Sequence, residues 1–172
     1  MPMRPSFIIY VCAGMCFLSM STACRLSQTS FDRNRSQCQR NMRSIEVAVK
    51  EFPHDHSGDR PRTLDDALSN IGFADAERSA EILRCPGITS VTASGDLESR
   101  TGYHYVDWSR WFGRTNVVPA FYPLIYDLSI HNHDGRGINI VFVDGSIIWD
   151  EGAKTLRDFS FKHPEYKLPL PQ

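Results

Sequence analysis

Apolar residues recur every three or four positions between residues 38 and 52. The positions are Cys38, Met42, Ile45, Val49 and Phe52. This spacing puts all five side chains on one face of a helix, so it predicts an amphipathic helix laid on a core. We expect the helix to begin near residues 27–30 and to end at Phe52, because Pro53 lacks an amide hydrogen and restricts the residue before it.

Two shorter helices are predicted after a polar loop. Thr63 stands three positions before Asp66, and a hydroxyl residue followed by an acidic one at this spacing suits the start of a helix that runs through Leu68. Another helix is expected at residues 74–83, where the following Cys-Pro pair, with Pro86, would stop it.

Beyond this point the pattern changes to short apolar runs that are typical of strands. We expect strands at residues 102–108, 124–130, 139–143 and 146–149. Asp144-Gly145 separates the last two runs, and this dipeptide predicts a hairpin with a type I′ turn, in which both central residues have positive φ. A helix followed by antiparallel strands predicts the α+β class. Residues 157–172, with three prolines, predict a surface tail.

The first 24 residues have the pattern of a targeting segment. Arg4 precedes an apolar run at residues 7–20, and residues 5–24 carry no charge. A basic start, an apolar centre and small residues at the exit predict a secretory signal, and a retained membrane span is the alternative. The chain therefore divides into a leader or anchor at residues 1–24, a globular domain at 25–156 and the tail.

The end of this segment, Ser21-Thr22-Ala23-Cys24, resembles a bacterial lipoprotein processing box. That resemblance implies acylation of Cys24, and ordinary cleavage after Ala23 is the other interpretation. Five arginines follow between residues 25 and 43. They argue against easy export, because a positive flank favours the cytoplasmic side of a membrane.

The stretch HNHDGRGINIVFVDGSIIW at residues 131–149 resembles the C-terminal motif of prepilin-like proteins, the prepilin-type processing-associated domain. That motif has a His, nine residues and then Asp-Gly. Earlier matches to the same family are Cys-x-x-Asn, Leu-x-Cys-Pro and an Asp before the His loop. The matching positions are Cys38, Asn41, Cys85, Pro86, Asp127, His133, Asn139, Asp144 and Gly145.

The resemblance implies a pilin-like N-terminal helix packed on a small antiparallel sheet, and a role in the cell envelope related to type II secretion or type IV pilus-like assemblies. Three departures stand beside it. Ten residues, not nine, separate His133 from Asp144, and Ser146 replaces the usual His after Asp-Gly. The prepilin cleavage signature, with its Glu, does not occur at the N-terminus.

The charge balance argues against a nucleic-acid partner. The 172 residues include 19 basic and 20 acidic side chains, for a net charge of −1. A protein that binds nucleic acid usually carries a basic patch that neutralises phosphates.

Two of the five cysteines lie in the globular part, Cys38 and Cys85. In an oxidising compartment they would pair, and closing a loop of about 47 residues would stabilise the fold by about 4 kcal/mol. Two buried free thiols are the alternative in a reducing compartment.

Histidines and carboxylates form two candidate metal clusters. One is His54-Asp55-His56 with Asp59, although a solvated loop is the simpler interpretation. In the second, His131 and His133 would face one side of a strand and could chelate a metal with Asp127 or Asp144. A turn role for Asp144 and loop hydrogen bonds for His133 are the structural alternative.

Calcium is a further option for the second cluster, with oxygen ligands from Asp127, Asp134 and Asp144. The related secretion pseudopilins that bind calcium in a C-terminal loop suggest it, although no calcium-loop spacing is present.

The patterns together predict a non-enzymatic, envelope-associated protein that needs no cofactor. It would bind an envelope protein or assemble with itself through the N-terminal segment, and reach the membrane by lipid or a single span. The sequence has no Gly-x-Ser-x-Gly elbow and no phosphate-binding loop. The competing hypothesis is a metal-dependent hydrolase that uses His54 and His56 with His131 and His133.

Overall fold

The computed structural model describes residues 6–69, 81, 83–88, 97–113 and 117–172, with side chains described from Ser30 onwards. The chain separates into two compact units, Met1–Arg33 and Asn34–Gln172. Helix α1 spans Ser6–Asp55 and so begins in the first unit and ends in the second. None of the helices in the described part of the chain has a stretch long and apolar enough to cross a membrane.

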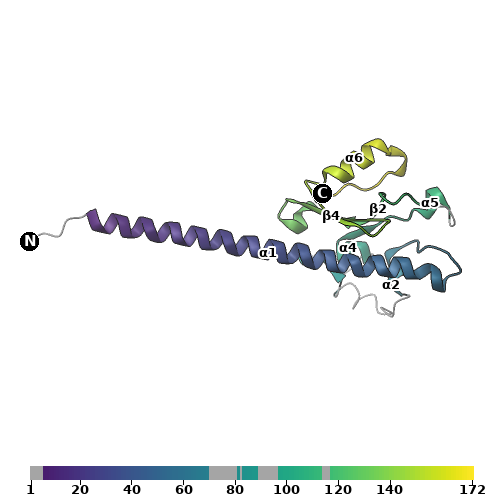
Figure 1. The fold of residues 1–172 in the computed structure, drawn as a ribbon, viewed down its shortest axis with the longest axis horizontal. Coiled ribbons are helices and arrows are strands. Elements are labelled where there is room, and N and C mark those ends of the chain that lie inside the picture. Colours follow the sequence, from purple (N-terminus) through teal and green to yellow (C-terminus); the bar gives the residue numbers. More distant parts are fainter. Residues whose placement is uncertain (1–5, 70–80, 82, 89–96, 114–116) are drawn as a thin grey trace, which may run out of the picture. The chain divides into compact units, whose positions relative to one another are not determined.

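The second unit contains a four-stranded antiparallel sheet in the order β1-β2-β3-β4 (Figure 1). The strands are β1 (Tyr103–Tyr105), β2 (Pro123–Asp127), β3 (Gly137–Phe142) and β4 (Ile147–Glu151). The prediction of a mixed fold with a long helix and antiparallel strands is therefore confirmed. The first two strands are shorter than predicted, because the chain leaves the sheet at Val106 and Leu128.

Both faces of the central strand β3 are covered. Side chains alternate between the faces of a strand, so Asn139 and Val141 share one face, and Asn139 accepts a hydrogen bond from Gln39 of α1. Ile140 and Phe142, on the other face, line a cavity together with residues of the C-terminal helix α6 (Lys154–Lys162). This explains why β3 is almost continuously buried.

The apolar face predicted for the first helix is confirmed. All five of its side chains are buried, from Cys38 to Phe52. The bounds differ from the prediction at both ends. The helix begins at Ser6 because no proline interrupts residues 6–52. It also continues through Pro53 to Asp55, where a last turn is closed by the Gly58 amide, which donates to the Pro53 carbonyl over 2.9 Å.

The capped short helix is confirmed as α2 (Leu64–Ser69). Thr63 Oγ1 accepts a hydrogen bond from the Asp66 amide over 3.1 Å, and the Asp66 carboxylate accepts one from the Thr63 amide over 3.0 Å. This reciprocal pair satisfies two amides that the first turn leaves free. The helix predicted at residues 74–83 lies mostly outside the described residues; of it, Glu81 and Leu83 are helical. A further short helix, α4 (Leu97–Thr101), precedes β1.

The hairpin between β3 and β4 is confirmed, but the predicted type I′ turn is wrong. Gly145 has a φ of +88° and Asp144 does not have a positive φ. The Gly145 amide donates to the Phe142 carbonyl, and the Phe142 amide donates to the Ser146 carbonyl. These bonds define a three-residue loop with glycine in the left-handed position. Asp144 favours this alternative because its carboxylate accepts the amide and the hydroxyl of Ser146.

Residues 157–172, predicted as a surface tail, are mostly exposed and pack along the folded domain. Helix α6 begins where the buried Asp150 carboxylate accepts the amides of Thr155 and Leu156. After α6 comes a short 3₁₀ turn at Pro164–Tyr166. Leu168 is buried in the core, and the Tyr126 hydroxyl donates to the Pro169 carbonyl over 2.8 Å. Residues 164–172, which include three prolines, therefore form a strap that packs on the domain.

Aromatic side chains surround Trp108. Helix α5 (Ser109–Phe112) follows this tryptophan, which is 2% exposed. Its indole nitrogen donates to the Pro123 carbonyl over 2.8 Å, and its ring meets those of Tyr122 and Tyr166 at centroid distances of 5.0 Å. Core packing is therefore the role of this cluster.

Candidate functional site

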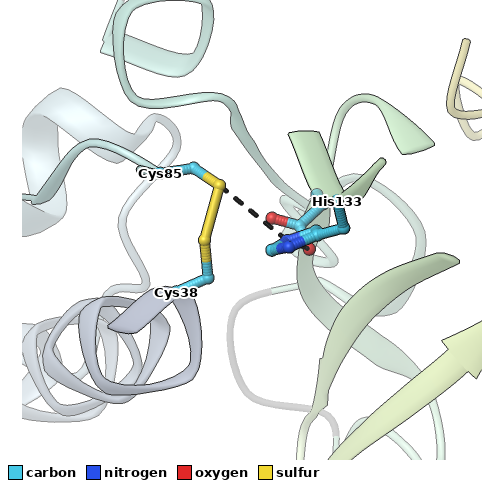
Figure 2. Close-up of side chains that lie close together, drawn as sticks. Cys38, Cys85 and His133 are labelled. Atoms are coloured by element: carbon cyan, nitrogen blue, oxygen red, sulfur yellow. Dashed lines mark hydrogen bonds and ion pairs between the residues drawn. A yellow bond between two sulfur atoms is a disulfide. The ribbon is translucent and has the colours of Figure 1, made fainter. Parts of the chain in front are cut away.

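A disulfide joins Cys38 of α1 to Cys85 of the loop before β1 (Figure 2). The two Cα atoms are 5.2 Å apart, and both residues are fully buried. Cys85 is held in place by its own backbone, because its amide donates to the Thr101 carbonyl over 2.9 Å. The bridge ties the helix to a segment that is 47 residues away in sequence.

Asp127 and His133 lie beside the disulfide and are also fully buried. Asp127 is the last residue of β2, and His133 ends the 3₁₀ helix η1 (Ile130–His133). His133 Nε2 lies 3.0 Å from Asp127 Oδ2. A carboxylate only accepts hydrogen bonds, so the hydrogen of this contact is on Nε2.

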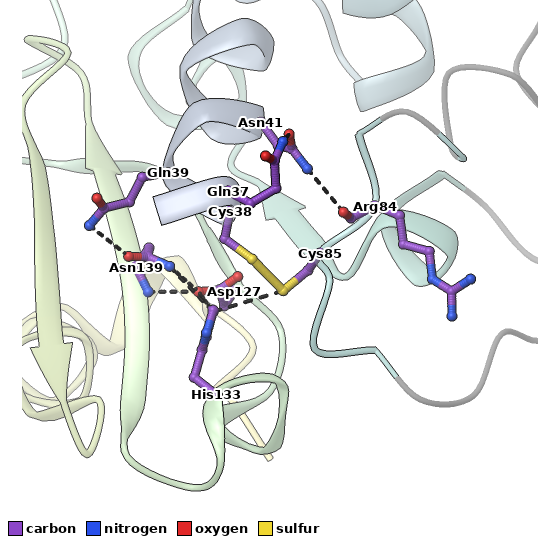
Figure 3. Close-up of a disulfide and its surroundings, with 9 residues drawn as sticks. All are labelled: Gln37, Cys38, Gln39, Asn41, Arg84, Cys85, Asp127, His133 and Asn139. Atoms are coloured by element: carbon purple, nitrogen blue, oxygen red, sulfur yellow. Dashed lines mark hydrogen bonds and ion pairs between the residues drawn. A yellow bond between two sulfur atoms is a disulfide. The ribbon is translucent and has the colours of Figure 1, made fainter. Parts of the chain in front are cut away.

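Asn139 of β3 completes the group (Figure 3). Its backbone amide donates to Asp127 Oδ2 over 2.7 Å, and its side-chain amide donates to the same oxygen over 3.0 Å. One carboxylate oxygen thus accepts bonds from Asn139 and His133 together. Asn139 Oδ1 in turn accepts from Gln39 Nε2 of α1 over 3.0 Å, so the network also reaches the helix.

His133 lies between the carboxylate and the disulfide. Its Nε2 atom is 3.8 Å from Cys85 Sγ (Figure 2) and 3.3 Å from Asn139 Nδ2. The ring also meets Trp149 edge-on, with a centroid distance of 5.3 Å. These contacts fix the ring orientation, so the imidazole is a positioned group in a dry environment.

The site also changes the pKa of a neighbouring tyrosine, Tyr103. Burial, and secondly the negative charge of Asp127, raise the pKa of Tyr103 well above its ordinary value. Tyr103 is fully buried in β1. It therefore stays protonated, and no ionised phenolate is available in this site at neutral pH.

A glycine brings the cysteine loop close to His133. A Cβ atom on Gly87 would come within 1.5 Å of the Asn132 carbonyl oxygen, which leaves no room for a side chain. Gly87 thus allows the loop that carries Cys85 to pack directly on η1. Neither Gly87 nor Gln39 could be identified from the sequence, because neither carries a local signal for contacts this far apart in sequence.

The donor atoms of this cluster are of types that would bind a metal ion if the disulfide were reduced. Among the described residues, only Cys38, Cys85, Asp127 and His133 form a group of three or more metal-ligating side chains with donor atoms within 4.8 Å of one another. The structure thus gathers six of the motif residues, from five segments, in one buried place. Cys38, Cys85, Asp127, His133 and Asn139 form it directly, and Asn41 donates to the Arg84 carbonyl next to Cys85 over 2.9 Å.

Of the metal set predicted around His133, the structure brings Asp127 next to this histidine but not His131 or Asp144. His131 is exposed and lies in η1, not in a strand, so it does not share a face with the buried His133. Asp144 is exposed in the hairpin turn and accepts hydrogen bonds from Ser146. The calcium alternative fails for the same reason, because Asp134 caps η1 on the surface, with a φ of +57°.

The other predicted positions lie apart from this cluster. His54 and His56 are exposed at the end of α1, and the ring of His56 stacks on Phe52 at a centroid distance of 3.7 Å. Pro86 follows Cys85 in an exposed turn. Cys24 is helical within α1, and its side chain lies outside the described part.

A second polar contact ties α1 to the hairpin. Glu46, 3% exposed, forms ion pairs with Arg43 and with Lys50 on the same helix. Arg43 also donates to the Gly145 carbonyl over 2.7 Å. Gly145 therefore matters as a contact point as well as a turn residue.

No protein-family model matches the sequence, and neither a curated protein nor a solved structure matches it.

Proposed function

We propose that this protein is a non-enzymatic, envelope-associated, pseudopilin-like protein with a structural or protein-interaction role. The observation that supports the proposal is the convergence of the motif residues. Positions that are scattered from Cys38 to Asn139 in the sequence meet in one buried cluster. If a family keeps its fold and varies its surface, we expect the residues of its shared motif to stabilise one another.

Burial also favours a structural role for the motif. Asp127, His133 and Asn139 are each at most 1% exposed. A general acid or base has to reach the proton that it transfers, and a substrate could touch these side chains only if the sheet and the helix separated. The motif histidine therefore acts on the protein itself, by holding η1 against β2.

The disulfide fits an exported protein, because such bonds persist in oxidising compartments. On this proposal the leader directs export, and Cys24 carries the lipid or the chain is cleaved after Ala23. The partner is an envelope protein, or a second copy bound through the N-terminal segment.

The first test is the intact mass of the full-length chain expressed in a bacterium, measured before and after reduction in the membrane and soluble fractions. We expect a membrane-bound species that begins at Cys24 with added acyl mass, and a gain of two hydrogen atoms on reduction. A Cys24→Ser variant is the control, because it removes the acylated thiol and leaves the disulfide intact.

An uncleaved chain with reduced cysteines in the cytoplasm would contradict the proposal. Cross-linking in intact cells then examines the partner. Links between copies through residues 7–24 would favour self-assembly, and links from the folded domain to another envelope protein would favour a binding module.

A further inference from the structure

We propose that reduction of the disulfide turns the buried cluster into a zinc site with Cys38, Cys85, Asp127 and His133 as ligands. The four donor atoms all lie within 4.8 Å of one another. Two thiolates, one imidazole and one carboxylate are a ligand set that suits tetrahedral zinc. Figure 3 shows that these ligands come from α1, the Cys85 loop, β2 and η1, so one ion would hold together four separate segments.

The spacing of the donors agrees with this geometry. With zinc–sulfur bonds of about 2.3 Å and zinc–nitrogen bonds of about 2.0 Å, ligand atoms at neighbouring corners of a tetrahedron are about 3.3–3.8 Å apart. His133 Nε2 lies 3.8 Å from Cys85 Sγ. It also lies 3.0 Å from Oδ2 of the Asp127 carboxylate, whose other oxygen, Oδ1, would bind the ion. To admit the ion, the two sulfurs would have to separate from their bonded distance of about 2 Å to about 3.8 Å, and the carboxylate would have to move outward.

The carboxylate has an unused donor atom at this position. Asp127 Oδ1 is buried and has no hydrogen-bond partner in the described part of the chain. A buried oxygen without a partner is costly, and a cation would compensate it. Asp127 Oδ2 meanwhile stays oriented by the two amide groups of Asn139, which is the role of outer-shell residues around a metal.

The imidazole has to change its tautomer. In the disulfide form the hydrogen is on Nε2, where it points to Asp127. Zinc would take Nε2, so the hydrogen moves to Nδ1, a buried atom with no hydrogen-bond partner among the described residues. This rearrangement costs free energy, and we expect a weaker site than one whose histidine has a partner on both nitrogens.

The change from the disulfide form to the zinc-bound form balances in electrons and protons. A dithiol reductant gives two electrons and two protons to the sulfurs of Cys38 and Cys85, the S–S bond breaks, and the dithiol is oxidised to its own disulfide. Zn²⁺ then displaces the two thiol protons to solvent. The disulfide and the zinc site exclude each other, and either one ties α1 to the Cys85 loop.

The test is a titration of the reduced full-length protein, in detergent and without oxygen, with Zn²⁺ and with Co²⁺ as a coloured substitute. We expect one ion per chain, a cobalt–thiolate charge-transfer band with the visible bands of tetrahedral cobalt, and protection of two thiols from alkylation. The same protein with its disulfide intact should bind no ion at this site. Asn139→Ala should weaken binding by about 10–100-fold.

Matched variants separate this site from the exposed histidines. His133→Gln should abolish the tetrahedral cobalt spectrum, and His131→Gln should leave it unchanged, since His131 is exposed two residues away. Binding that persists when both cysteines are replaced by serine would overturn the proposal.

Folding is followed in the same samples by circular dichroism. Reduced wild-type protein that is unfolded without metal and folds with one Zn²⁺ supports the site. Reduced wild-type protein that binds no Zn²⁺, whether it is folded or unfolded, would overturn it. The circular dichroism and zinc-binding measurements use the unmutated chain, so a variant that fails to fold does not affect them.

Discussion

At the scale of single residues, Asp127 accepts three buried hydrogen bonds. One of its oxygens accepts hydrogen bonds from His133 and from both amide groups of Asn139. Hydrogen bonds to a charged group contribute more than neutral ones, and a buried group that loses its partner costs more still. The residues of the cluster could be singled out from the sequence because they resemble a family motif, but their contacts with one another could not be predicted.

Asp127→Asn should destabilise the fold by about 2 kcal/mol or more, because the charge is lost and the new NH2 group either faces the donors of Asn139 or is buried without an acceptor. The measurement is urea denaturation of the oxidised protein. The control is Asp134→Asn, on the surface at a φ of +57° that asparagine also tolerates. It should stay within about 0.5 kcal/mol of wild type. Equal effects of the two changes would contradict the special role of Asp127.

Asp144 predicts a pH dependence at the hairpin. Hydrogen bonds from the side chain and then the amide of Ser146 hold the pKa of this exposed carboxyl below its ordinary value of 3.8. The ionised form is therefore the one that the fold favours. Its contribution to stability is present above the ordinary pKa and is lost as pH falls through the lower pKa of the folded state.

Ser146→Ala should raise the pKa of Asp144 toward 3.8, because the largest cause of the shift is removed. An NMR titration of the carboxyl carbon measures it directly. In thermal unfolding, the variant should be less stable than wild type at neutral pH, and the difference should shrink in acid. A pKa that does not move would show that the Ser146 hydroxyl does not hold the carboxylate in solution.

At the scale of elements, helix α1 is joined to the sheet at two places. One is the disulfide cluster, and the other is the hairpin turn, where the Gly145 carbonyl accepts a hydrogen bond from Arg43 of α1. The periodicity of the helix and the position of the hairpin could be predicted, because each depends on residues close in sequence. The turn type could not, because the Ser146 contacts and the helix decide which loop the Asp-Gly pair adopts.

Gly145→Ala should destabilise the protein more than Gly58→Ala. Both glycines have nearly the same φ, +88° and +87°, and a side chain in that region costs about 1–2 kcal/mol. An added Cβ on Gly145 would lie 2.7 Å from Glu46 Oε1, whereas nothing lies within 4 Å at Gly58. The difference between the two variants in urea denaturation therefore measures the contact with α1, and no difference would mean that the contact is absent.

At the scale of the whole molecule, segments distant in sequence hold the second unit together. The disulfide joins positions 47 residues apart, and the C-terminal strap returns to β2, where the Tyr126 hydroxyl donates to the Pro169 carbonyl. Three residues further along the strap, the Gln172 carbonyl accepts a hydrogen bond from the Ile130 amide. The last residues thus help to position η1, which carries His133.

Removal of the disulfide by Cys38→Ala with Cys85→Ala should lower the free energy of unfolding by about 4 kcal/mol, because the unfolded chain gains the freedom of a long loop. The measurement is denaturation in the presence of a chelator, so that no metal contributes. Cys24→Ser should leave the stability unchanged. A loss as small as that of the Cys24 variant would mean that the bridge adds nothing to the fold.

The sequence by itself determined the apolar phase of α1, the cap of α2, the place of the hairpin and the α+β class. These follow from helical spacing, cap chemistry and turn residues, which act over a few positions. Only the tertiary structure decided that His133 turns inward while His131 stays outside, that His133 and Asn139 both bind one oxygen of Asp127, and that the C-terminal residues form a strap. Such contacts depend on strand register and on how the helix packs on the sheet, and no local pattern encodes them.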